Sequence, residues 1–255
     1  MIQINDLYYK NVISDLSISF SKNKFYTISG PNRCGKTSLL KIINRDILTD
    51  EDIRLNNKSI YDYDIINYNN IVGLLDSDNK FIMDTVENVI KFILIKHNIY
   101  NKDYLKSLLV KYELYDYRKM YVDELDVSKK IYLKFIEYVL DDKKIILIDN
   151  IDNYCSNEDM MRIIKIINGL KESITFIMTI NNLEYSLESD YLYIIDGSSI
   201  VLEGIPFDVL LNDTVINKVG LELPFMFDLS IKLNDYELLN EIVLDMDRMI
   251  DKLWK

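Results

Sequence analysis

Gly30-Pro31-Asn32-Arg33-Cys34-Gly35-Lys36-Thr37 matches the phosphate-loop pattern G-x-x-x-x-G-K-[ST]. The apolar segment 25–29 precedes it and predicts a β-strand, and an amphipathic run over 39–43 follows it and predicts a helix. A strand before the loop and a helix after it form the context in which this motif holds phosphate. The stretch therefore predicts an α/β fold built around a P-loop.

The residue types in this loop suit the phosphates of a nucleotide. Successive backbone N–H groups and the N-terminus of the following helix form a cradle for anions. Lys36 adds a positive charge, and the Thr37 hydroxyl can ligate Mg²⁺. The predicted nucleotide contacts in this stretch are Gly30, Asn32, Arg33, Cys34, Gly35, Lys36, Thr37 and Ser38.

A second candidate for the metal site is Asp149, which ends the apolar run 145–148. Taken alone, an acid at the end of a strand is most simply a solvated side chain. In a domain that carries a P-loop, the same acid can hold Mg²⁺ together with the loop hydroxyl. We therefore predict Thr37 and Asp149 as the metal ligands.

Strand and helix patterns alternate around the loop. The unbroken apolar run 144–149 predicts a parallel strand that is buried on both faces, and 191–203 predicts a hairpin around Asp196-Gly197. Helical spacing dominates 84–141 and returns after Ile205. We expect a main domain over 1–204, with a helical subdomain at about 84–142, and a C-terminal helical extension over 205–255.

Composition narrows the possible functions. The chain has 255 residues, of which 49% are hydrophobic and 28% charged, which is typical of a folded protein with a full core. Its net charge of -11 disfavours binding to nucleic acid. No run approaches the roughly 18 apolar residues of a membrane-spanning helix, and the first residues lack the pattern of a signal peptide. Two cysteines fit a reducing cytosol, so any membrane contact is expected to be peripheral.

The order and spacing of these features resemble the ATP-binding subunits of ABC transporters, over nearly the whole chain. Two further segments are similar to those of the energy-coupling factor (ECF) subfamily, which imports vitamins and transition metals. One comprises Asp78-Asn79-Lys80-Phe81 and Thr85-Val86-Glu87, and the other is Val219-Gly220-Leu221-Glu222-Leu223-Pro224-Phe225. The latter resembles a segment of an extra helical domain that serves dimerisation in that subfamily.

This resemblance implies cofactors, partners and a location. The cofactors would be ATP and Mg²⁺, and the adenine would stack on Tyr9 or Tyr8. The partners would be a second ABC ATPase subunit and a separate transmembrane subunit, which docks at the groove near the Q-loop. The chain would then lie in the cytoplasm, peripheral on the inner face of the cell membrane.

The positions that carry catalysis in the family are nearly all substituted. Leu125-Asp126-Val127-Ser128-Lys129 stands in place of the LSGGQ signature, which faces the γ-phosphate bound by the partner. Asn150 stands in place of the general-base glutamate, and Asn181 in place of the switch histidine. An amide can orient water but cannot take its proton at neutral pH. Three further substitutions follow the same alignment: Asp76 or Ser77 for the Q-loop glutamine, Ser156 for the D-loop aspartate, and Arg33 for a loop glycine.

Three hypotheses account for these substitutions. The first is an ATP-binding subunit of an ECF-like importer that hydrolyses ATP poorly, paired more naturally with a different ATPase than with itself. The second is an active ATPase in which Asn150, Asp76 or Asp152 activates water. The third is a regulatory or structural subunit that no longer uses nucleotide. Arg33 favours it, and so does the Q-loop segment around Asp76, which is shorter than in the family. The retained loop and Asp149 favour the first.

Overall fold

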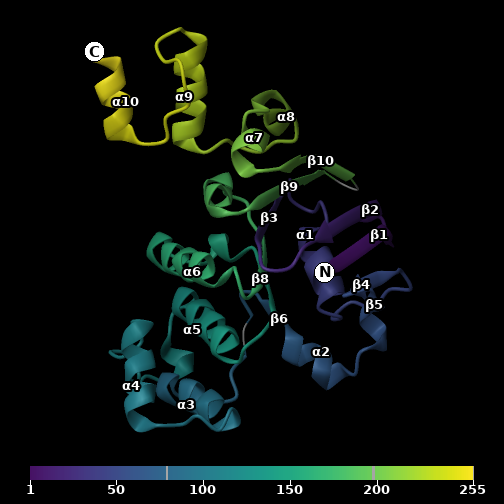
Figure 1. The fold of residues 1–255 in the computed structure, drawn as a ribbon, viewed down its shortest axis with the longest axis vertical. Helices are drawn as coiled ribbons and strands as arrows, with labels where there is room; N and C mark the ends of the chain where they lie inside the picture. The colour runs from purple at the N-terminus through teal and green to yellow at the C-terminus, as the bar shows by residue number, and fades with distance from the viewer. Residues whose placement is uncertain (79, 197–198, 255) are drawn as a thin grey trace.

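The computed structural model describes residues 1–78, 80–196 and 199–254, and these residues form two β-sheets (Figure 1). Asn79 and Gly197, which belong to two of the segments singled out above, lie outside the described residues. The larger sheet has six strands in the order β10-β9-β3-β8-β7-β6. Their bounds are β3 Phe25–Ser29, β6 Val72–Leu75, β7 Ile145–Asp149, β8 Thr175–Thr179, β9 Tyr191–Asp196 and β10 Ser199–Gly204.

Strands β3, β7 and β8 form the centre of this sheet. Each runs parallel to both of its neighbours, and every residue in the three strands is buried. Continuous apolar runs form strands of this kind because both faces of a parallel sheet are covered. The prediction of a buried parallel strand at 144–149 is therefore confirmed. The register places Asp149 beside Thr179, at the carboxyl ends of adjacent strands.

The smaller sheet is antiparallel, with the order β2-β1-β4-β5. Its strands are β1 Ile2–Tyr9, β2 Ile13–Phe20, β4 Ile53–Leu55 and β5 Lys58–Ser59. Helix α1, Lys36–Ile43, buries Leu39, Leu40, Ile42 and Ile43 in the core that this sheet shares with β3, β7 and β9. Helix α2, Ile65–Ile71, leads from this part of the chain into β6 and is capped by Asp64. The P-loop is thus held between two sheets.

The predicted helices between 84 and 142 are present as α3 Val86–Lys96, α4 Lys102–Lys111 and α5 Val127–Leu140. In Figure 1 they gather at the end of the molecule away from the antiparallel sheet. Their apolar faces share one core with α6, Asn157–Leu170, and with the larger sheet. Side chains of Thr85, Asn101, Asp126 and Ser156 cap the N-termini of α3, α4, α5 and α6. Caps of this type fix where each helix begins.

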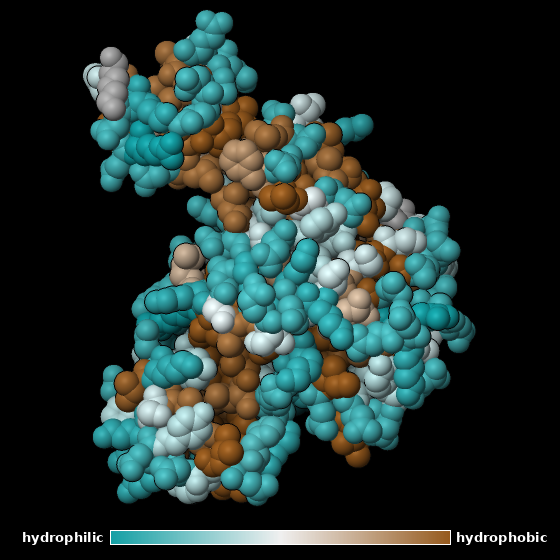
Figure 2. Space-filling model, in the orientation of Figure 1, coloured by the Kyte–Doolittle hydropathy of each residue, from teal (hydrophilic) through white to brown (hydrophobic). Residues whose placement is uncertain are grey.

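The described residues from Ile205 to Trp254 form four helices: α7 Pro206–Leu210, α8 Asp213–Lys218, α9 Phe225–Asp235 and α10 Met246–Leu253. Pro206, Gly220 and Pro224 each lie at a helix boundary, as their backbone preferences predict. Helices α9 and α10 project from the body of the molecule (Figure 1). Figure 2 shows apolar side chains gathered on the visible face around α7 to α9. Among the described residues, no helix combines the length and apolar character needed to cross a bilayer.

Candidate functional site

The segment 30–37 follows β3 and runs into the first turn of α1, as predicted, and it borders a pocket with a volume of about 350 Å³. Residues from three parts of the chain line this pocket. The lining comprises Val12, Asn32, Arg33, Cys34, Gly35, Lys36, Thr37, Ser38 and Asn150. All the predicted loop contacts except Gly30 therefore face one cavity, together with the residue at the general-base position.

Both glycines of the loop are required by close contacts. A Cβ at position 30 would lie 2.1 Å from the carbonyl oxygen of Ile195, in the neighbouring strand β9. Gly35 has a φ of +100°, and a Cβ there would lie 2.7 Å from Cγ1 of Ile13. Any larger residue at either position must displace the loop from the sheets that hold it. The glycines thus serve the path of the backbone.

Lys36 lies within the loop and is 5% exposed. Its Nζ donates to the carbonyl oxygen of Gly30 at 2.5 Å and to that of Pro31 at 3.2 Å. These carbonyls hold the ammonium group at the floor of the pocket, where phosphate oxygens could replace them as acceptors. Cys34 is buried beside it, and burial raises the pKa of the Cys34 thiol, so the thiol stays neutral.

The two predicted metal ligands meet. Thr37 Oγ1 donates to Asp149 Oδ1 at 3.0 Å, and Thr179 Oγ1 donates to the same oxygen at 2.8 Å. Both Thr37 and Asp149 offer hard oxygen atoms, which suit Mg²⁺. In the described part of the chain, no group of three or more His, Cys, Asp or Glu residues could hold a metal ion. Two protein oxygens fit a cation that draws its remaining ligands from phosphate and water, as Mg²⁺ does.

Thr179 is a contributor that the sequence analysis missed. It ends β8, and the register sets it directly beside Asp149. Its hydroxyl donates to Asp149 and accepts from the backbone N–H of Asn150 at 2.9 Å. Its position at the end of 173–179, a run rich in apolar and β-branched residues, is the signal that could have identified it, because parallel strands end at the same edge of a sheet.

Burial is the largest influence on Asp149 and raises the pKa of its carboxyl, while the hydroxyls of Thr179 and Thr37 act in the opposite direction. The folded protein without a cation therefore binds a proton more readily than the unfolded chain. Its stability falls as pH rises from the ordinary aspartate pKa through the raised value.

We therefore expect Asp149→Asn to stabilise the cation-free protein at neutral pH, because the variant buries no charge. The gain should disappear below about pH 4, where the wild-type carboxyl is protonated in both the folded and the unfolded protein. Urea unfolding across this pH range measures the effect. Asp251→Asn, at an exposed residue of α10, is the control and should show no such gain. An Asp149→Asn variant less stable than wild type at neutral pH would contradict the account.

The general-base position is occupied by an amide with a defined contact. Asn150 adopts a left-handed backbone with φ of 46°, and its Nδ2 lies 3.4 Å from Thr37 Oγ1. The Asn181 side chain does not line the pocket. Its backbone N–H, at 2.7 Å, and that of Asn182 donate to Oδ2 of Asp152. Asp152 thus orders the loop after β8.

The aromatic candidates lie apart from this pocket. Tyr9 ends β1 and is half-buried, with Lys10 Nζ 5.1 Å from the centre of its ring, and Tyr8 is exposed. Val12 lines the pocket, whereas neither tyrosine does. At the Q-loop position, Asp76 follows β6 and accepts a hydrogen bond from the backbone of Asp78 at 2.9 Å.

Arg33 has a φ of +68°, in the left-handed region where glycine is favoured, and its exposed side chain lines the pocket. The loop therefore keeps its path despite the arginine, at the expense of backbone strain. We expect Arg33→Gly to stabilise the protein by about 1 kcal/mol through release of this strain. Urea unfolding measures the change. Asn23→Gly at a φ of +57° is the matched control, with a smaller gain because asparagine tolerates this region. No gain for Arg33→Gly would rule out the strain.

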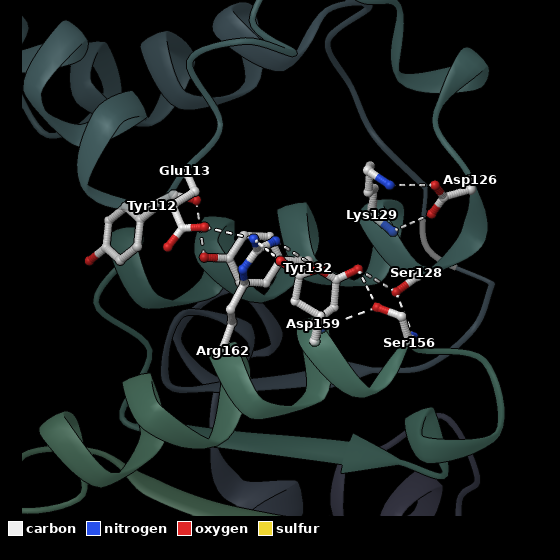
Figure 3. A network of polar contacts seen from close by, with 10 residues as sticks. Tyr112, Glu113, Asp126, Ser128, Lys129, Tyr132, Ser156, Asp159 and Arg162 are labelled. Atoms are coloured by element: carbon white, nitrogen blue, oxygen red, sulfur yellow. Dashed lines mark hydrogen bonds and ion pairs between the residues drawn. The ribbon is translucent and has the colours of Figure 1, made fainter.

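Residues of the segment at the signature position contact one another (Figure 3). The Asp126 carboxylate caps α5, accepting from the backbone N–H of Lys129 at 2.8 Å and from its Nζ at 2.6 Å. The Lys129 ammonium contributes most to lowering the pKa of Asp126, so this carboxyl stays ionised. A negative charge thus occupies the helix N-terminus, where an anion from outside would otherwise be favoured.

Ser128 faces the interior of the domain. Its Oγ donates to the buried carboxylate of Asp159 at 2.6 Å, and Ser156 Oγ donates to the same oxygen at 3.1 Å. Arg162 reaches the other oxygen of Asp159 at 3.1 Å and pairs with Glu113 at 2.7 Å. The start of α5 and the start of α6 are therefore joined by one polar network (Figure 3).

Comparisons with known proteins agree with this geometry. The family model described as "ABC transporter" matches residues 13–153. The energy-coupling factor transporter ATP-binding protein EcfA1 of Mycoplasmopsis pulmonis is 24% identical, with 93% of this chain and 95% of the relative covered. EcfA of Enterococcus faecium is also 24% identical, with coverage of 95% and 90%.

Solved structures are similar in fold. CbiO1 from Clostridium perfringens, described as part of the ABC transporter complex cbiONQ, aligns with a TM-score of 0.70 and 18% identity, covering 86% of this chain and 94% of that one. The ATP-binding cassette MJ0796, in a dimeric state bound to ADP and Pi, aligns with a TM-score of 0.67 and 14% identity, covering 81% and 99%. The predicted P-loop α/β fold is confirmed, and the chain belongs to the ABC transporter family, with the fold of its ATPase domain.

Proposed function

We propose that this chain is the ATP-binding subunit of an ECF-like importer of vitamins or metal ions, and that it binds Mg-ATP but hydrolyses it slowly. The observation that carries the proposal is the composition of the pocket. Lys36, Thr37 and Asp149 lie together as a phosphate and cation site needs them, while an amide stands at the general-base position. The names of the relatives in M. pulmonis and E. faecium support the transporter type.

In this proposal the loop holds the nucleotide. Backbone N–H groups of the loop and the Lys36 ammonium bind phosphate oxygens, while Thr37 and Asp149 bind Mg²⁺. When bound, Mg²⁺ offsets the negative charge of the phosphates. The residues assigned to ATP are Gly30, Asn32, Arg33, Cys34, Gly35, Lys36, Thr37 and Ser38, with Tyr9 at the adenine.

Slow hydrolysis follows from three positions. Asn150 cannot accept the proton of an attacking water, and the loss of a positioned base typically costs roughly 10²–10⁴ in rate. Asn181 is likewise an amide, and Asp126 presents a carboxylate, 56% exposed at its side chain, where the signature serine would stand. A γ-phosphate brought to Asp126 by a partner would meet repulsion.

We propose two kinds of partner. A second ABC ATPase subunit with intact residues is favoured over a second copy, because a homodimer would set Asp126 against both nucleotides. A transmembrane subunit would dock in the groove of about 450 Å³ between 80–84 and 121–123, where Ile82 is 80% and Tyr121 is 56% exposed. The chain would thus lie in the cytoplasm on the inner face of the membrane.

The same proposal assigns a role to each part of the chain. Residues 1–204 would form the ATP-binding domain, with the helical subdomain at about 84–142 facing the membrane subunit. The extension 205–255 would serve dimerisation. Its exposed apolar side chains support this role, among them Phe225 at 66% and Trp254 at 85% exposure.

The experiment that tests the proposal is steady-state ATP hydrolysis by the complex purified through a tag on this chain. We expect turnover roughly 10²–10⁴ below that of an ABC importer with an intact general base. Turnover equal to that of the intact importer, lost on Asn150→Ala, would instead support an active ATPase with substituted residues. Absence of nucleotide binding would point to a structural subunit.

A further inference from the structure

The side chain of Asn150 has a definite orientation in the polar cluster at the end of β7. The Thr37 hydroxyl has a single proton, and it donates that proton to Asp149 at 3.0 Å. Its contact with the Asn150 side chain, at 3.4 Å, must therefore come from the amide NH₂ group. The backbone N–H of Asn150 is fixed as well, by the Thr179 hydroxyl at 2.9 Å.

This orientation leaves the amide oxygen of Asn150 without a partner. Oδ1 is inaccessible to solvent and accepts no hydrogen bond, although the residue lines the phosphate-loop pocket. A buried acceptor that stays unpaired is unfavourable. At functional sites such an atom calls for an explanation, and an ion or water that binds there is one of them. The neighbouring oxygen donors are Thr37 and Asp149, the pair assigned above to Mg²⁺.

We propose that Asn150 is a positioning residue for the divalent cation. Its NH₂ group holds the Thr37 hydroxyl in place. When the cation binds, the cluster opens enough for Oδ1, which solvent does not reach in this structure, to accept a hydrogen bond from a water molecule of the cation. A glutamate at this position could not donate to Thr37, and it would add a second carboxylate beside Asp149. The position that serves proton transfer in active relatives thus serves cation binding here. This inference rests on the proposed binding of Mg-ATP.

The test measures the dissociation constant of a fluorescent ATP analogue for the full chain, in Mg²⁺ and in EDTA. We expect Mg²⁺ to tighten binding by wild type. Asn150→Ala should reduce that Mg²⁺-dependent gain by about tenfold, the effect of losing a group that orients a metal ligand. Binding in EDTA should stay within about twofold of wild type. Asn150→Gln, which keeps both an NH₂ donor and an oxygen acceptor, should retain most of the gain.

Asn168→Ala is the matched control. Asn168 also has a buried Oδ1 without a partner, but it lies on α6, away from the pocket, where its Nδ2 donates to Glu188 at 3.0 Å. It should bind the analogue as wild type does in both conditions.

Three results would overturn the inference. The first is a full Mg²⁺ gain in Asn150→Ala. The second is equal loss of affinity with and without Mg²⁺, which would mean a structural role in the loop. The third is wild-type binding that does not depend on Mg²⁺. This result would support the nucleotide site but not the cation site. Wild type that binds no analogue in either condition would instead overturn the proposed function itself.

Discussion

Lys36→Ala is expected to abolish the thermal stabilisation of this protein by Mg-ATP. Lys36 places the ammonium group of the loop at the floor of the pocket, within reach of the carbonyls that phosphate oxygens would replace. At about 100-fold excess over the dissociation constant, a ligand stabilises by roughly 2.7 kcal/mol. For a protein of this size the shift in melting temperature is roughly 5–10 °C. A thermal scan with and without Mg-ATP measures it.

The control is Lys165→Ala, which removes an exposed lysine of α6 and should keep the full shift. Both variants should melt close to wild type in the absence of ligand or slightly below it, so that a lost shift reports binding. If Lys36→Ala kept the stabilisation of wild type, the loop would not be the nucleotide site.

Gly30→Ala is expected to have the largest effect on folding. Its Cβ would lie 2.1 Å from a backbone oxygen of β9, so the loop or the strand must move. Overpacking in a dense interior costs typically about 1–3 kcal/mol and more where the obstacle is rigid, so we expect about 3 kcal/mol or more. The midpoint of urea unfolding and the yield of soluble protein measure the loss.

Gly169→Ala provides the matched substitution. Gly169 is exposed on α6, and a Cβ there would meet nothing within 4 Å. Alanine favours helix over glycine, so this variant should gain about 0.5–1 kcal/mol. Opposite signs for the same chemical change would separate the close contact at the loop from any general effect of alanine. Equal stability of the two variants would contradict the packing described here.

The parts of the fold that the sequence predicted are those with a local cause. The loop follows from the spacing of Gly30, Gly35 and Lys36, and β7 follows from an unbroken apolar run. The helices over 84–141 follow from apolar residues at helical spacing, as in α3. In each case the residues that determine the structure are neighbours in the chain, so a pattern could reveal them.

The features that the sequence could not predict depend on contacts between distant residues. Whether Arg33 fits the loop depends on its φ, which no spacing fixes. The pairing of Asp149 with Thr179 depends on the register between β7 and β8. The sequence shows only that Asn150 replaces the general base, whereas the structure shows that its amide donates a hydrogen bond to Thr37.

The signature position is a further feature whose contacts the sequence did not reveal. The sequence identifies the loss of serine and glycine at 125–129 but not what takes their place. The structure supplies a capping carboxylate at Asp126 and a second network through Ser128 and Asp159. Asp126, Ser128 and Lys129, which form these networks, stand in place of the serine, a glycine and the glutamine of the signature. The segment has thus acquired stabilising contacts of its own while losing the groups that would meet phosphate.

The proposed function requires that this chain binds Mg-ATP and seldom hydrolyses it. The most direct test incubates the purified complex with radiolabelled ATP and Mg²⁺, removes free nucleotide, quenches the sample and identifies the nucleotide that stays bound. We expect ATP to be recovered intact, and we expect Lys36→Ala in this chain to lower the amount bound. Recovery of ADP as the main species, or an amount of bound ATP that Lys36→Ala leaves unchanged, would contradict it.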